Sequence, residues 1–144
     1  MRRLALAFFL ECSATAFADA SPLLVDVPAL AHASQPAVEQ ILGKPEFCRK
    51  SKLGLSCRYA TRGVEIVFVK DKAERITINE MDDTLFDKSA ISRLGFGDQQ
   101  PDESSEEIMR WQHVSGVAEI ALHSNKDRID YAVVVLTPLG DKQK

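Results

Sequence analysis

The sequence predicts an α+β fold in which two tandem α-β-β-β units form an antiparallel sheet with two short helices packed on one face. Residues 57–79 contain three short runs of β-branched and aromatic residues separated by glycine or charged residues, a pattern typical of strands joined by tight turns. Residues 109–137 repeat this pattern. A short helical pattern precedes each set of runs, which gives each unit one helix.

The first unit covers residues 34–80 and begins with a helix over Ser34–Leu42. Ser34 is a suitable N-cap, and Pro36 fits the first turn because its missing N–H would have no helical partner there. Gly43 ends the helix, and Pro45 prevents it from continuing. Three strands are expected to follow: Cys57–Thr61, Val64–Lys70 and Glu74–Asn79.

The second unit covers residues 86–137 and begins with a helix over Asp87–Leu94. Asp87 can cap this helix, and Phe86 before the cap can pack on Ile91 as a hydrophobic staple. Gly95 favours a left-handed ending, after which Phe96 can fold back on Ile91. Three strands are again expected: Met109–Val114, Val117–Ser124 and Arg128–Thr137.

The two units also match each other residue by residue. Leu42-Gly43 and Leu94-Gly95 are equivalent helix endings. With a two-residue hairpin loop in each unit, Tyr59 lies opposite Ile66, and its equivalent Trp111 lies opposite Ile120. Such self-similarity indicates one supersecondary unit used twice, and chance similarity between two amphipathic hairpins is the alternative. Residues 130–137 are apolar on both faces, so this strand is expected at the centre of the sheet or covered on both sides.

Residues 1–20 have the features of a secretory signal peptide rather than of a folded segment. Arg2-Arg3 forms a positive start, Leu4–Leu10 a short apolar core, and Ala18-Asp19-Ala20 a cleavage site. The sequence therefore predicts a periplasmic or secreted protein whose mature chain, residues 21–144, is a single domain. Cys12 raises the alternative of a lipoprotein, but Glu11 does not fit the small residue expected before a lipidated cysteine.

Cys48 and Cys57 are the two cysteines of the expected mature chain. In an oxidising compartment they predict one disulfide, and two free thiols are the alternative. A metal site is less favoured because the histidines show no ligand spacing, and we expect no cofactor. The formal net charge of −3 argues against a general nucleic-acid binder. After the signal peptide, no segment is apolar for long enough to cross a membrane.

Two polar segments have opposite charge and join each helix to its first predicted strand. The first contains Arg49, Lys50 and Lys52, and the second contains Asp102, Glu103, Glu106 and Glu107. One interpretation is a polarised rim that binds a partner. The other is a pair of ordinary solvated loops that attract each other weakly.

Tyr59 and Trp111 are candidate anchors if a sheet face binds a partner, and core residues between sheet and helices otherwise. The sequence contains no glycine-rich phosphate loop, nucleophile elbow or zinc-protease motif. Adjacent acids such as Asp82-Asp83 point apart on an extended chain, so they do not indicate a shared acid–base site. We therefore expect no enzymatic activity.

A helix that ends in L-G-x-P, followed by a three-stranded meander and then repeated, resembles the tandem units of the β-lactamase-inhibitor-protein-like fold. A single unit is similar to the small outer-membrane assembly lipoproteins of the SmpA/OmlA type. The residues that carry this resemblance are Ile41–Pro45, Tyr59, Gly63–Phe68 and Arg75–Ile78. The resemblance implies a secreted, non-catalytic binding role.

The leading expectation is an extracytoplasmic protein-binding module, either inhibitor-like or an accessory of envelope assembly, whose partner is another extracytoplasmic protein. A small secreted hydrolase with an unrecognised site is one alternative. A carrier that holds a small ligand in a cleft between sheet and helices is another. The sequence indicates neither the partner nor the oligomeric state.

Overall fold

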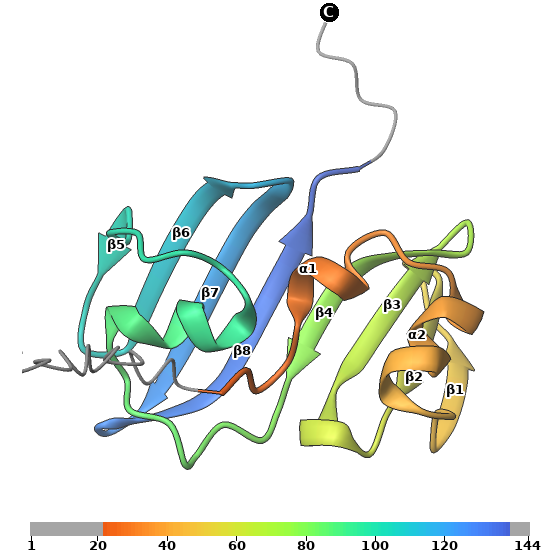
Figure 1. Ribbon diagram of the computed structural model, residues 1–144, viewed down its shortest axis with the longest axis horizontal. Coiled ribbons are helices and arrows are strands. Elements are labelled where there is room, and N and C mark those ends of the chain that lie inside the picture. Colours follow the sequence, from red (N-terminus) through yellow and green to blue (C-terminus); the bar gives the residue numbers. More distant parts are fainter. Residues whose placement is uncertain (1–21, 139–144) are drawn as a thin grey trace, which may run out of the picture.

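The structure, a computed structural model, describes residues 22–138. All eight strands of this part form one antiparallel sheet with the order β1-β2-β3-β4-β8-β7-β6-β5 (Figure 1). The strands are β1 Phe47–Lys50, β2 Leu55–Arg58, β3 Glu65–Val69, β4 Lys72–Ile78, β5 Glu103–Ser104, β6 Ile108–Val114, β7 Val117–Asn125 and β8 Arg128–Leu136. The predicted signal peptide lies outside the described residues.

Three short helices lie on one face of this sheet: α1 Val27–Leu30, α2 Gln35–Leu42 and the 3₁₀ helix η2 Lys88–Leu94 (Figure 1). A single 3₁₀ turn, η1 Thr61–Gly63, connects β2 to β3. The α+β class, the antiparallel sheet and the one-sided packing of helices are therefore confirmed.

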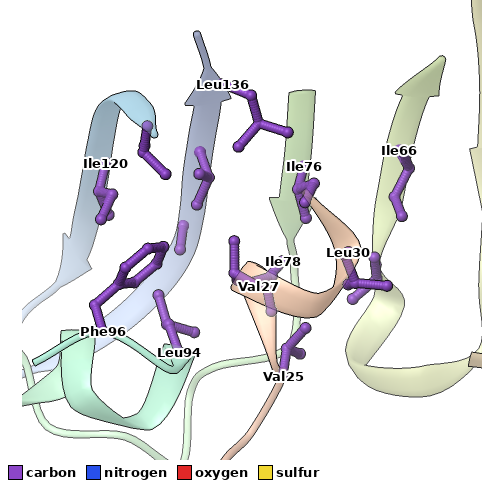
Figure 2. Close-up of a cluster of buried hydrophobic side chains, with 14 of the residues drawn as sticks. Val25, Val27, Leu30, Ile66, Ile76, Ile78, Leu94, Phe96, Ile120 and Leu136 are labelled. Atoms are coloured by element: carbon purple, nitrogen blue, oxygen red, sulfur yellow. The ribbon is translucent and has the colours of Figure 1, made fainter. Parts of the chain in front are cut away.

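The core lies between the helices and the sheet. Every second side chain of each central strand points into it. Across the sheet, Ile66 pairs with Ile76, Ile76 with Val134, and Val134 with Ile120. Figure 2 shows Val27 and Leu30 of α1 over this face of the sheet, with Leu30 between Ile78 and Ile66, and all of these residues are buried. Both predicted helices are short, so burial of such residues, rather than helix propensity, is what stabilises them.

The ends of both predicted helices are confirmed. The Ser34 hydroxyl accepts a hydrogen bond from the Ala37 N–H of α2 at 3.3 Å, and Gly43 at its end has a φ of 82°. Asp87 caps η2, and Gly95 at its end has a φ of 91°. Beyond it, the Phe96 N–H donates to the Ile91 carbonyl at 3.2 Å. The segment is a 3₁₀ helix over its whole length, a tighter helix that is common in short pieces.

The six predicted strands are all present, and β8 lies between β4 and β7 in the centre of the sheet, as expected from its composition. Two strands and one helix were not predicted. All four side chains of β1 are exposed, so no alternation of apolar and polar residues marks it. β5 has two residues and α1 has four, which is too short for a periodic pattern.

One predicted register is confirmed and the other is wrong. Trp111 pairs with Ile120, as expected from the two-residue loop Ser115-Gly116. In the first hairpin, however, Cys57 pairs with Ile66, and the Tyr59 N–H donates to the Val64 carbonyl at 2.8 Å. The loop there is longer than predicted because Thr61–Gly63 form the η1 turn after Ala60, with left-handed φ angles of 51° at Arg62 and 56° at Gly63.

Candidate binding surface

The face of the sheet opposite the helices has an apolar centre. In register, Thr77 of β4 pairs with Val133 of β8, and Arg75 pairs with Val135. Val67 of β3 pairs with Arg75 on the same face. The helices of the described chain cover only the other face (Figure 1), and the valines on this one are half-buried. We call this surface the open face.

Two adjoining hollows, of about 300 and about 360 Å³, lie on the open face over β1–β4 and β8. Both are lined by Leu53, Val67 and Arg75, and we call them together the open-face hollow. Leu53, in the turn between β1 and β2, is 62% exposed. Val135 closes the hollow on the β8 side. The hollow therefore presents aliphatic side chains to solvent beside two arginines, Arg49 and Arg75.

The two arginines of the hollow differ in whether a carboxylate lies close enough to form an ion pair. The Arg49 guanidinium lies 3.7 Å from the Glu65 carboxylate, and both residues line the hollow. Among the described residues, Arg75 makes no ion pair within 4.0 Å. Glu74, at the irregular step between β3 and β4, also lines the hollow. A cation among aliphatic side chains suits a partner that supplies both an apolar contact and a hydrogen-bond acceptor.

Only one of the three predicted basic residues belongs to this hollow. Arg49 pairs with Ser56, on the open face, whereas Lys50 pairs with Leu55, on the helix-covered side. Lys52 is exposed in the turn between these strands. Strand alternation thus separates residues that are adjacent in sequence.

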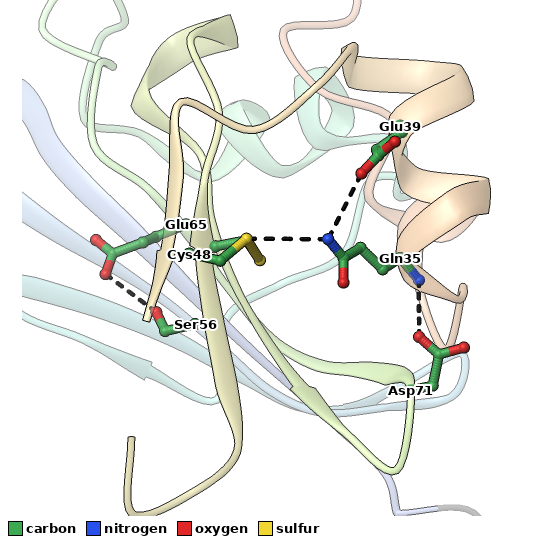
Figure 3. The surroundings of a disulfide bond; sticks show 7 residues. Gln35, Glu39, Cys48, Ser56, Glu65 and Asp71 are labelled. Carbon is green, nitrogen blue, oxygen red and sulfur yellow. Dashed lines mark hydrogen bonds between the residues drawn. A yellow bond between two sulfur atoms is a disulfide. The ribbon is translucent and has the colours of Figure 1, made fainter. Parts of the chain in front are cut away.

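Cys48 and Cys57 form the predicted disulfide, with an S–S distance of 2.04 Å. They are direct partners on β1 and β2, so the bond joins the edge strand to its neighbour. Cys57 is buried and Cys48 is exposed. The Gln35 amide of α2 lies 3.9 Å from the Cys48 sulfur (Figure 3). The disulfide therefore fixes the strand that holds Arg49.

The acidic segment lies at the opposite edge of the sheet. β1 and β5 are the two end strands of the sheet order, so the basic and acidic segments do not form one continuous rim. The Asp102 carboxylate accepts a hydrogen bond from the Gln112 N–H at 2.7 Å, and Glu103 pairs with Arg110 at 2.8 Å. Glu106 and Glu107 are exposed in the turn that follows β5.

Tyr59 and Trp111 are core residues, and neither offers surface to a partner in this structure. Both are fully buried on the helix-covered side. The Trp111 indole N–H donates to the Gln99 carbonyl at 2.9 Å. The Tyr59 hydroxyl has no hydrogen-bond partner. Burial, with a smaller contribution from the Glu39 carboxylate, raises the pKa of Tyr59 to about 12. Tyr59 and Trp111 are therefore not part of the candidate binding surface.

The remainder of the open face, towards β6, is polar. Arg110 lies 3.9 Å from Glu119 in addition to its contact with Glu103. The rings of His123 and Tyr131 stack with centroids 4.3 Å apart. Burial and the nearby Arg110 lower the pKa of His123, so the neutral imidazole is favoured.

Within residues 22–138, no group of three or more His, Cys, Asp or Glu side chains is placed to hold a metal ion. None of the helices in this range is long and apolar enough to span a membrane.

Four residues at the centre of the open-face hollow were not predicted from the sequence: Leu53, Val67, Arg75 and Val135. A signal for two of them was present, because Val67 and Val135 lie in strands that are apolar at successive positions. No protein-family profile, curated protein or solved structure matches this chain.

Proposed function

We propose that this chain is an extracytoplasmic, non-catalytic protein-binding module that docks its partner on the open face of the sheet. The observation that supports this most is the open-face hollow. Aliphatic side chains there are accessible to solvent although the opposite side of the same strands is buried under helices. Exposed aliphatic side chains beside Arg49 and Arg75 offer the mixture of apolar contact and hydrogen-bond donors that is common in protein interfaces.

The location outside the cytoplasm rests on two features. The chain begins with a sequence that has the pattern of a signal peptide. In addition, the Cys48–Cys57 disulfide agrees with an oxidising compartment, since such bonds are rare in the cytosol. Mass spectrometry of the exported protein tests this directly: the mature chain should begin at Ser21 and contain no free thiol.

We further propose that the chain consists of two related units. Each would contain a helix and a run of four strands, β1–β4 after α2 and β5–β8 after η2. The strand order supports this, because the first strand of each run is at an edge and the last strands, β4 and β8, pair in the middle. The resemblance to β-lactamase-inhibitor-protein-like and SmpA/OmlA-type domains belongs to the same proposal.

The alternative function, a carrier that holds a small ligand between sheet and helices, lacks support in the described residues. The space between sheet and helices is filled by the side chains of the core (Figure 2). The open-face hollow is open to solvent and is lined by residues of several strands, which suits contact with a protein surface better than enclosure of a small ligand. A secreted hydrolase would need an activated nucleophile. The Ser56 hydroxyl lies 3.4 Å from the Glu65 carboxylate in this hollow, but the same carboxylate oxygen lies 3.7 Å from Arg49, and no histidine of the described chain lines the hollow as a base.

The experiment compares two lysine substitutions in the exported protein. Val67→Lys places a charge in the open-face hollow, and Ile41→Lys places the same charge at an exposed position of α2 on the other side. Chemical cross-linking in envelope extract, followed by mass spectrometry, identifies partners of the wild-type chain. The proposal expects that Val67→Lys removes one stoichiometric protein partner and that Ile41→Lys keeps it. Retention of the partner by a folded Val67→Lys variant contradicts docking on the open face.

A further inference from the structure

A second groove lies at the end of the sheet where β7 turns into β8. It has a volume of about 930 Å³ and is lined by three segments. These are residues 85–87 before η2, residues 104–109 around the turn from β5 to β6, and residues 124–127 of the β7–β8 turn. It shares no lining residue with the open-face hollow. We call it the hairpin-end groove.

Hydrogen bonds fix the walls of this groove against the β7–β8 turn. The Ser124 hydroxyl donates to the Glu106 carbonyl at 2.6 Å, and the Ser124 N–H donates to the Glu107 carbonyl at 2.9 Å. On the other side, the Phe86 N–H donates to the Asp127 carbonyl at 2.9 Å. These contacts use backbone carbonyls and leave the acidic side chains of the same residues available. A ligand would therefore meet a preformed site with little ordering required.

The groove has an apolar wall. Leu85 is 53% exposed and is one of the few large hydrophobic side chains on the surface of the described chain. Phe86 beside it and Met109 of β6 are half-buried and also line the groove. A partly exposed leucine in a concave site stabilises a complex when an apolar side chain of the ligand covers it.

The charge of the groove is negative and largely uncompensated. Four carboxylates line it, from Asp87, Glu106, Glu107 and Asp127, together with the single cation Lys126. Asp87 is engaged as the N-cap of η2. Among the described residues, none of the other three carboxylates forms an ion pair within 4.0 Å. This charge repels phosphates and favours cations at the ends of long side chains.

We infer that the hairpin-end groove binds a basic peptide segment in which a lysine or arginine stands next to an apolar residue. The apolar side chain packs on Leu85, and the cation lies against Glu106 and Glu107. The geometry favours a peptide over a metal ion, because the described residues form no cluster of ligands for one. This inference does not depend on the open face, since the two sites have separate linings.

The probe is a fluorescein-labelled peptide, glycine-lysine-leucine-lysine-glycine, titrated with the exported full-length mature protein at low salt. The same peptide with glutamate in place of lysine is its control. Glu106→Gln with Glu107→Gln removes two charges from the groove, and Glu80→Gln with Asp98→Asn removes two from exposed positions outside it. The first pair should weaken binding about fivefold, and the second pair should leave it within a factor of about two.

A second pair of variants separates a built groove from general charge attraction. Leu85→Ser truncates the apolar wall, and Leu23→Ser truncates a leucine of nearly equal exposure elsewhere, 52% against 53%. Only Leu85→Ser should weaken binding, again about fivefold. Three results overturn the inference: no saturable binding of the lysine peptide, equal losses in the two charge-removal pairs, or no effect of Leu85→Ser. Loss of the open-face partner by Val67→Lys leaves all three tests unchanged, so the two proposals fail separately.

Discussion

The disulfide is predicted to hold one edge strand rather than the whole fold. All four side chains of β1 are exposed, so hydrophobic burial contributes little to its attachment. β1 pairs only with β2 among the described strands. The Cys48–Cys57 bond is therefore the principal covalent constraint on this strand, and its loss should have local consequences.

The magnitude follows from the length of the closed loop. The two cysteines are separated by 9 residues, and chain-entropy theory gives about 2.6 kcal/mol for closing a loop of this size. For a domain of this length, such a change lowers Tm by about 10 °C. Removal of the bond in Cys48→Ala/Cys57→Ala should thus leave a folded protein with moderately reduced stability.

The assay is hydrogen exchange read by mass spectrometry, together with thermal unfolding, for the oxidised protein, the reduced protein and the double alanine variant. The amides of residues 47–50 should exchange faster after loss of the bond, while those of β3, β4 and β8 stay protected. Loss of protection throughout the sheet would refute the reasoning, because the disulfide would then support the core. Unchanged protection of residues 47–50 would refute it too, since the backbone ladder alone would hold the strand.

Three further predictions concern single residues. Tyr59→Phe removes a buried hydroxyl without a partner, so urea unfolding at pH 7 should find it equal to or up to about 1 kcal/mol more stable than the wild type. The pKa of Tyr59 is about 12 in the folded protein against an ordinary value of 10.0, so its contribution to the free energy of unfolding is fully present below pH 10 and is lost as the pH rises towards 12. The stability of Tyr59→Phe should not show this loss. Burial lowers the pKa of His123 from its ordinary value of 6.5, so the wild-type protein should become less stable as the pH drops below 6.5. The urea midpoint of His123→Gln should decrease less than that of the wild type over the same pH range. Gly95→Ala should destabilise more than Gly116→Ala in thermal unfolding: both glycines have positive φ, but a Cβ at Gly95 would lie 2.8 Å from the Pro28 ring, whereas Gly116 faces open space.

The fold could be predicted where side-chain pattern and turn chemistry agree. In the second half of the chain, strands that alternate around Ser115-Gly116 fix the register of Trp111 against Ile120. In the first half, Arg62 has a left-handed φ of 51°, which its side chain does not predict. The loop is longer as a result, and the register between β2 and β3 differs from the predicted one. β1 was missed because its exposed residues leave no burial pattern to detect.

The candidate site was harder to predict because it depends on which strands are neighbours. The apolar positions Val133 and Val135 indicated a central strand, which is confirmed, but cover on both faces was the other interpretation of the same pattern. Only the pairing of β4 with β8 places Val135 beside Arg75 from the first half of the chain. The charged segments were visible in the sequence, whereas their separation to opposite edges follows from the strand order.

The central position of β8 determines when the described sheet can be completed during synthesis. β4 and β7 have no direct pairing with each other, and β8 is the strand that joins them. Until residues 128–136 have emerged, a nascent chain exposes two open strand edges with apolar flanks, which favour pairing with other chains. The two halves of the sheet therefore join only after β8 has emerged. A premature stop shortly before Arg128 should produce an aggregating fragment rather than a smaller functional domain.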